Sequence, residues 1–158
     1  MHDRGLTDKL FRLAMSITGN REDAEDVVQD ALLNVWKKQE EGIEIQNVEA
    51  YCFRSVRNIA IDKIALTDNQ SLTWDENYDV PSATKSAQEL LEQAEQMELL
   101  ERCIRQLPEK QRTIFQLREV EELSYKEIAE AMNFSEEQVK VNLFRARQKL
   151  RELLTKVN

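Results

Sequence analysis

The chain has 158 residues, which suits one or two small domains. One third of the residues are charged and 6% are aromatic, with only three glycines and two prolines, and this composition favours an all-α protein. No apolar run approaches the length of a membrane span, and the polar start MHDRGLTDK is unlike a signal peptide. We therefore expect neither direct membrane insertion nor secretion.

The cysteine and histidine content argues against a metal or disulfide framework. Cys52 and Cys103 lie far apart within helical patterns, and the single histidine is His2. We expect two buried free thiols, as in a cytoplasmic protein, and neither a metal site nor a cofactor.

Three helical patterns make up the first part of the chain. They cover residues 6–18, 20–38 and 47–66, and the latter two begin at Asn20 and Asn47, residues that favour the N-cap position. In the second pattern, six apolar residues share one side and predict a core face: Ala24, Val27, Val28, Ala31, Leu32 and Val35.

The middle of the chain is acidic and has no helical period. Residues 67–85 include Pro81 and predict a solvated tether. A helix over 86–106 follows, and another runs over 108–120, with Pro108 in its first turn. The predicted organisation is two small helical domains joined by a flexible acidic linker: 1–66, 67–85 and 86–158.

Residues 123–150, LSYKEIAEAMNFSEEQVKVNLFRARQKL, predict a helix-turn-helix at the C-terminal end. Two capping boxes, each a serine followed three residues later by Glu or Gln, start helices at Ser124 and Ser135. Asn133 falls in the turn, where a left-handed conformation is needed. The second helix of such a motif enters the major groove of DNA.

The outward face of that second helix combines basic and apolar side chains. Lysines and arginines alone fit an ordinary solvated surface equally well, but Val141 and Phe144 on the same face favour contact with thymine methyls and sugars. From Gln138 onward there are six basic residues and one acidic residue, although the chain as a whole carries −8. The free protein should therefore bind DNA non-specifically only weakly.

Two other helices present faces that suggest partners. In the second helix, Asp26, Gln29 and Asp30 surround Leu33 and Trp36, which suits either a protein-binding face or a solvated acidic face. In the third, a core stripe is predicted at Val48, Cys52, Val56, Ile59 and Ala60. Its far side carries the aromatic, guanidinium and amide groups that bind single-stranded DNA, although an ordinary helix surface fits as well: Tyr51, Arg54, Arg57 and Asn58.

Three segments in combination resemble the extracytoplasmic-function (ECF) sigma factors of bacterial RNA polymerase, in the sigma-70 family. They are TGNREDAEDVVQDALLNVW, RNIAID and LPEKQRTIFQLREVEELSYKEIAEAMNFSEEQVKVNLFRARQKLREL. The resemblance spans nearly the whole chain apart from the linker and the first few residues. It implies a protein without catalysis of its own, which binds core RNA polymerase and directs promoter recognition, DNA melting and transcription initiation. An anti-sigma factor is a common further partner in this family.

The resemblance also implies roles for individual residues. It assigns docking on core polymerase to Asp26, Gln29, Asp30 and Leu33. It assigns binding of the minus-ten element to Tyr51, Phe53, Arg54, Arg57 and Asn58. It assigns binding of the minus-thirty-five element to Arg118, Tyr125, Gln138, Lys140, Val141, Phe144 and Arg145.

The sequence departs from the family pattern in three places. The segment before the first helix is short, Tyr51 stands where tryptophan is frequent, and Val141 and Asn142 stand where serine and arginine are frequent. The promoter sequence that the protein reads therefore stays open.

Two other classes of function each fit part of the sequence. A homodimeric helix-turn-helix regulator would bind duplex DNA without polymerase, and a helical adaptor would bind only protein. The first leaves Asp26, Gln29, Arg54 and Asn58 without a role, and the second leaves the basic C-terminal helix without one. An enzyme is not expected, because the sequence offers no nucleophile–base pair, phosphate loop or metal ligand set.

Overall fold

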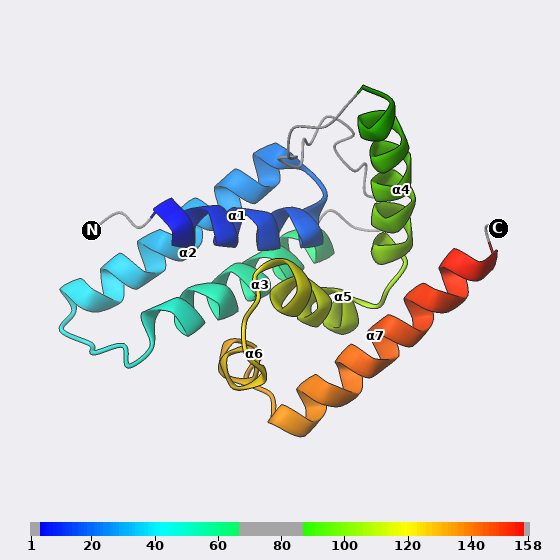
Figure 1. The fold of residues 1–158 in the computed structure, drawn as a ribbon. Coiled ribbons are helices and arrows are strands. Elements are labelled where there is room, and N and C mark those ends of the chain that lie inside the picture. The colour runs from blue at the N-terminus through cyan, green and yellow to red at the C-terminus, as the bar shows by residue number, and fades with distance from the viewer. Residues whose placement is uncertain (1–3, 67–86, 157–158) are drawn as a thin grey trace.

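The computed structural model describes residues 4–66 and 87–156, and within them the fold is all-α, as predicted (Figure 1). The predicted linker, residues 67–85, lies outside the described residues. The helices are α1 (Arg4–Thr18), α2 (Arg21–Glu40), α3 (Val48–Leu66), α4 (Ala87–Arg105), α5 (Glu109–Phe115), the π-helical turn η1 (Gln116–Val120), α6 (Tyr125–Met132) and α7 (Glu136–Lys156). We call α1–α3 the N-terminal half and α4–α7 the C-terminal half.

Local hydrogen bonds confirm the predicted helix starts. The side-chain oxygens of Asn20 and Asn47 each accept a backbone N–H three residues on, at 3.0 Å in both cases. At Ser124 and Ser135 both bonds of each capping box are formed, with lengths between 2.8 and 3.1 Å. Asn133 has φ 58°, the left-handed conformation expected in the turn. These ends are specified by side chains within a few residues of the backbone groups that they satisfy.

The predicted single helix over 108–120 is wrong in two respects. Pro108 precedes α5 as its N-cap, and the last five residues form the π-helical turn η1. The backbone N–H of Glu121 bonds the carbonyl of Gln116, so the turn is one residue wider than in an α-helix. Leu117 and Glu121 are both buried around this turn. The choice between the two hydrogen-bond registers depends on that packing and has no local sequence signal.

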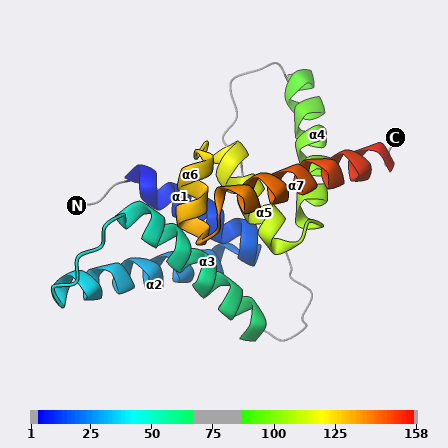
Figure 2. The same ribbon diagram turned by 90° about the horizontal axis from the view of Figure 1, so that it is seen from below.

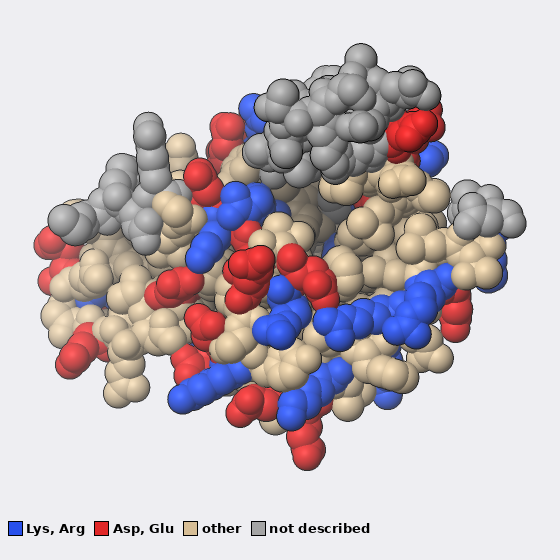
Figure 3. Space-filling view, viewed as in Figure 1, with Lys and Arg blue, Asp and Glu red and all other residues tan. Residues whose placement is uncertain are grey.

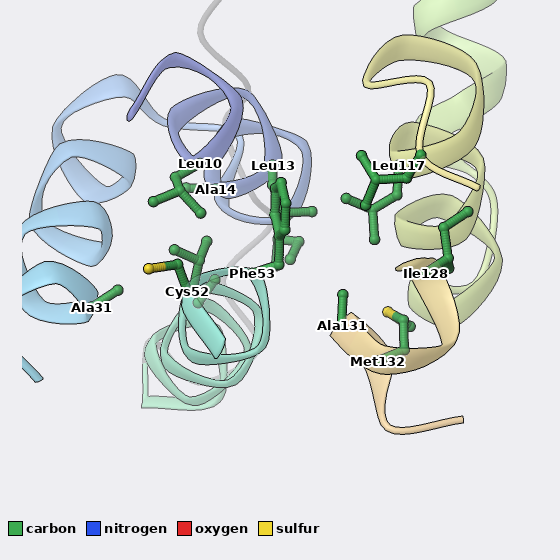
Figure 4. Close-up of a cluster of buried hydrophobic side chains, with 14 of the residues drawn as sticks. Leu10, Leu13, Ala14, Ala31, Cys52, Phe53, Leu117, Ile128, Ala131 and Met132 are labelled. Atoms are coloured by element: carbon green, nitrogen blue, oxygen red, sulfur yellow. The ribbon is translucent and has the colours of Figure 1, made fainter. Parts of the chain in front are cut away.

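One hydrophobic core extends through both halves. Leu13 of α1 and Phe53 of α3 face Leu117 of η1 and Ile128 of α6 in Figure 4, and all four side chains are fully buried. Figures 1 and 2 show α6 lying against α3, with α5 beside α1. The described residues of the two predicted domains therefore pack directly on one another.

The predicted core positions are mostly confirmed. Five of the six on α2 are buried and Leu32 is half-buried. On α3, Ile59 is half-buried and Val48, the first residue of the helix, is exposed, so Val48 is not a core residue. Helix α4 stands apart in Figure 1 and packs on α7 through a second, smaller cluster: Cys103, Leu107, Ala146 and Leu150.

Both cysteines are free and buried, as predicted. Burial raises the pKa of the Cys52 thiol, and the nearby carboxylate of Glu49 raises it further. The thiol form is therefore favoured at neutral pH. In the described ranges, no helix combines the length and apolar character that crossing a bilayer requires.

Candidate protein and nucleic-acid interfaces

The predicted protein-binding face of α2 is open to solvent. Asp26, Gln29 and Asp30 are exposed. On the same face, the side chain of Leu33 is 52% exposed and that of Trp36 is 58% exposed. The buried residues of α2 lie on the opposite side, against α1 and α3. This exposed leucine and tryptophan, surrounded by carboxylates and an amide, have the composition that is typical of protein-binding surfaces, with an apolar centre and a polar rim.

The predicted DNA-reading face of α7, called the reading face below, is also open to solvent. Val139, Leu143, Ala146 and Leu150 hold the helix in the core. The outward face is exposed, with Val141 at 45% and Phe144 at 65%, and its members are those predicted from the sequence: Gln138, Lys140, Val141, Phe144 and Arg145. Figure 3 shows basic side chains gathered along this helix. The helix therefore offers charge for phosphates and apolar groups for base methyls on one surface.

Arg118 and Tyr125, predicted to contact phosphates, are brought together beside the start of α7. The Arg118 guanidinium lies 4.7 Å from the centre of the Tyr125 ring, and Lys140 Nζ lies 5.8 Å from the same ring. Arg118 also donates a hydrogen bond of 2.9 Å to the carbonyl of Leu123. These stacking and hydrogen-bond contacts hold Arg118 in place next to the reading face.

Arg147 lies beside this cluster and is bound by a carboxylate. Its guanidinium is 2.5 Å from Glu119 Oε1, and the hydrogen bond from Arg147 to Glu119 raises the pKa of the arginine. This arginine therefore has a carboxylate partner within the protein and is not among the residues facing outward from the reading face.

The predicted DNA face of α3 is largely occupied by the C-terminal half. Arg57 donates two hydrogen bonds of 2.8 Å, from Nε and Nη2, to the two carboxylate oxygens of Glu109 at the start of α5. Thr113 Oγ1 donates to the same carboxylate at 2.7 Å. The pKa of Glu109 is lowered: burial raises it, but the hydrogen bonds from Arg57 and Thr113 and the nearby guanidinium charges outweigh burial.

Arg54 is engaged in a similar way by α6. Its Nη2 donates to the backbone carbonyl of Glu130, while its Nε is buried without a hydrogen-bond partner among the described residues. Beside it, Asn47 Nδ2 donates to the Glu130 carboxylate at 2.5 Å. The Arg54 side chain is thus covered by α6, but its Nε–H group has no hydrogen-bond acceptor among the described residues.

The remaining residues predicted on α3 divide into three environments. Asn58 is exposed. Tyr51 is half-buried, with Lys38 Nζ 5.6 Å from the centre of its ring. Phe53 is 1% exposed and lies in the shared core, so its ring is not on the surface of α3 where the prediction placed it. Its ring packs inward because it neighbours the core residue Cys52 on the buried side of the helix.

Several residues at this junction had no sequence signal. Arg12 Nε lies 2.6 Å from Oε1 of Glu121, whose side chain is completely buried, and 109 residues separate the pair in sequence. The groups that cover the arginines of α3 also come from segments at least 52 residues away: the Glu109 carboxylate, the Glu130 backbone carbonyl and the Phe134 ring. These contact residues could have been predicted only by someone who already knew how the two halves dock.

Comparison with known proteins agrees with this layout. Residues 4–70 match the family model of Sigma-70 region 2, and residues 97–150 match that of Sigma-70, region 4. Together the two matches cover more than half of the chain.

Curated relatives include three ECF RNA polymerase sigma factors. SigM of Bacillus subtilis is 28% identical over 144 residues, with 91% of this chain and 87% of SigM covered. SigW of the same organism is 27% identical over 156 residues, with 93% and 83% covered. SigE of Mycolicibacterium smegmatis is 26% identical over 151 residues; 94% of this chain is covered, but only 58% of SigE.

Two solved structures share the fold. The sigma factor RpoE from Bartonella quintana, in complex with the anti-sigma factor NepR, has a TM-score of 0.70 at 24% identity, covering 95% of this chain and 92% of that one. CnrH, in complex with the cytosolic domain of CnrY, has a TM-score of 0.66 at 22% identity, covering 96% and 83%. The two family models in their order along one chain, the relatives and the shared fold together establish that this chain belongs to the extracytoplasmic-function sigma factors of the sigma-70 family.

Proposed function

We propose that this sigma factor binds core RNA polymerase through α2 and reads promoter DNA through α3 and α7. As a member of its family it directs core polymerase to promoters for transcription initiation. The observation that carries the assignment of surfaces is the outward face of α7. The predicted reading residues on it are all exposed, while a buried stripe of the same helix anchors it in the core: Val139, Leu143, Ala146 and Leu150.

On α7, Lys140 and Arg145 suit contacts with phosphates or guanine edges, and Val141 and Phe144 suit thymine methyls and sugars. Arg118, stacked on Tyr125 at the base of this face, is positioned to contact the DNA backbone. We assign the minus-thirty-five element to this surface.

On α3, we assign the minus-ten element to four residues. Arg54 and Arg57 would hold the strand backbone, Tyr51 would stack on an unpaired base, and Asn58 would bond a base edge. Phe53 is left out because it belongs to the core.

The proposal includes no catalysis by the sigma factor itself; polymerase performs the chemistry. Because its partner acts on the chromosome, we propose a cytoplasmic location. Both solved neighbours are complexes with a further protein, one of them named as an anti-sigma factor, and this supports such a factor as an additional partner.

The test is run-off transcription with core polymerase over a promoter library, together with binding of core. Gln29→Ala should weaken core binding and leave the fold intact, because it removes an exposed amide from the docking face. Gln39→Ala, an exposed glutamine near the end of the same helix and outside that face, serves as the matched control. Equal affinity of the two variants would contradict the docking assignment.

Asn58→Ala should spare core binding and impair promoter opening, measured by permanganate reactivity of unpaired thymines. A lost base contact is worth about 1–3 kcal/mol, which corresponds to about a 5- to 150-fold loss. Tight sequence-specific duplex binding by a homodimer in the absence of polymerase would instead favour a conventional helix-turn-helix regulator.

A further inference from the structure

An arginine and a carboxylate that the proposed function does not use lie beside Arg118 and Tyr125. Arg147 of α7 and Glu119 of η1 are 2.5 Å apart, although 28 positions separate them in sequence. We propose that the Glu119–Arg147 pair is a positioning device, which aligns Tyr125 and Arg118 to bind one phosphate of the minus-thirty-five element. This inference rests on the proposed assignment of Arg118 to the DNA backbone.

Three elements meet at the Tyr125 ring. Tyr125 is the first residue of α6, whereas Arg118 and Glu119 are neighbours in the π-helical turn η1. Arg147 comes from α7. Such π-helical turns are rare and frequently lie at functional sites. Since no single helix fixes the relative positions of these side chains, contacts among the side chains themselves must align them.

Arg147 binds both the carboxylate and the phenol. Its hydrogen bond to Glu119 raises the pKa of the arginine most, and a hydrogen bond to the Tyr125 side chain raises it further. Because the phenol oxygen accepts from the guanidinium, the O–H of Tyr125 is directed away from Arg147 and can donate to another group. A DNA phosphate oxygen is a suitable acceptor for a tyrosine hydroxyl.

Glu119 makes Arg147 a poor phosphate ligand in its own right. The pair is formally neutral, and the carboxylate occupies Nη2 of the guanidinium. The other two cations instead approach the Tyr125 ring, Arg118 at 4.7 Å and Lys140 at 5.8 Å from its centre. The charge for a phosphate therefore comes from Arg118 and Lys140, while Arg147 orients the ring between them.

Arg118 depends on that ring for its own orientation. It stacks on Tyr125 and donates a hydrogen bond of 2.9 Å to the carbonyl of Leu123. A guanidinium held at both places loses less conformational entropy when it binds a phosphate. Loss of the Arg147 contact would free the Tyr125 ring and, through it, loosen Arg118.

The positioning role can be separated from a role in folding. The side chains of Arg147 and Glu119 are 43% and 39% exposed, and ion pairs this exposed add little to stability. The buried stripe of α7 stays intact when either residue is replaced. Variants at these two positions should therefore change DNA binding while thermal unfolding of the free chain stays close to wild type.

The experiment uses holoenzyme assembled from core polymerase and the full chain, bound to a promoter duplex from the library. Each phosphate of the minus-thirty-five element is replaced in turn by a neutral methylphosphonate, and the affinity is measured by competition. One position should be sensitive through Arg118 and Tyr125. Neutralising it should weaken wild-type binding by about three- to tenfold, the effect expected for one lost hydrogen bond.

Arg147→Ala should weaken binding of the unmodified duplex and abolish the effect of that methylphosphonate, as should Arg118→Ala. The two losses should not add in the double variant, because both act through the same phosphate. Glu119→Gln keeps an acceptor for Arg147 and should retain the effect, whereas Glu119→Ala should reduce it. The control is Arg151→Ala, which removes an equal charge from an exposed position about one turn along α7 and should leave that effect unchanged.

An unchanged methylphosphonate effect in Arg147→Ala overturns the proposal. Losses that add in the double variant also overturn it, because Arg147 would then bind a phosphate of its own. So does an enlarged effect in Glu119→Ala, which would show that Glu119 competes with DNA for Arg147. If Arg118→Ala instead leaves affinity and every methylphosphonate effect unchanged, the assignment of Arg118 to the DNA backbone fails, and the positioning role fails with it.

Discussion

Removal of Arg12 tests how strongly the two halves are joined. Arg12 Nε lies 2.6 and 3.2 Å from the two oxygens of Glu121, whose side chain is 0% exposed, whereas the Arg12 side chain is 37% exposed. Arg12→Ala leaves a buried carboxylate without this partner. Breaking a fully buried ion pair in this way costs about 3–5 kcal/mol.

The expected loss for Arg12→Ala is smaller, about 2–3 kcal/mol, because the arginine is already partly hydrated and screened in the folded protein. A second reason limits the effect: if α1 and η1 separate, Glu121 regains water without unfolding of either half. The loss in free energy of unfolding should therefore appear first as separation of the halves.

The assay is urea unfolding followed by circular dichroism, combined in a double-mutant cycle with Glu121→Gln. The matched control on the same helix is Lys9→Ala, which breaks an exposed pair with Glu49 at 3.9 Å and should change stability by less than about 0.5 kcal/mol. If Arg12→Ala is as mild as Lys9→Ala, the Arg12–Glu121 pair behaves as a surface ion pair and the reasoning is refuted.

Three further predictions concern local structure and pH. Ser124→Ala removes one bond of the α6 capping box and should lower stability by about 1 kcal/mol, seen as a fall in Tm of about 2–4 °C. Glu122→Gly should raise the free energy of unfolding by up to about 1 kcal/mol, since Glu122 has φ 59° and glycine adopts this conformation without strain; a lower Tm would show that its side chain makes a compensating contact. The lowered pKa of Glu109 stabilises the folded state fully above its ordinary value of 4.5, and this contribution is lost as the pH falls through the lowered value. Glu109→Gln should therefore flatten the fall in stability below about pH 4.5, and acid titrations that coincide with wild type would exclude the Arg57 contact as the cause.

Two features of this chain oppose binding of the free protein to DNA, one of long range and one local. Net charge of −8 already opposes non-specific association with phosphates. Carboxylate and carbonyl groups held directly on Arg57 and Arg54 add a local and specific barrier. The two effects can be separated, because added salt screens the net charge but acts less on a partly buried bidentate pair.

The sequence alone determined the features that depend on neighbouring residues. The caps at Asn20, Asn47, Ser124 and Ser135 and the left-handed Asn133 were predictable because side chain and backbone partner lie within a few residues of each other. The outward faces of α2 and α7 were predictable for a related reason: helical periodicity divides apolar from polar positions within one element.

Tertiary structure decided the features that depend on docking of the two halves. The burial of Phe53, the π-helical turn after Phe115 and the cover over Arg54 and Arg57 all involve that contact. The ion pairs and hydrogen bonds concerned join residues 52 to 109 positions apart, and a helical pattern specifies which side chains share a face but not which distant face will cover them. The sequence could therefore name the arginines of α3 as DNA-binding candidates, while only the packed chain revealed that its own carboxylate and carbonyl groups hold them.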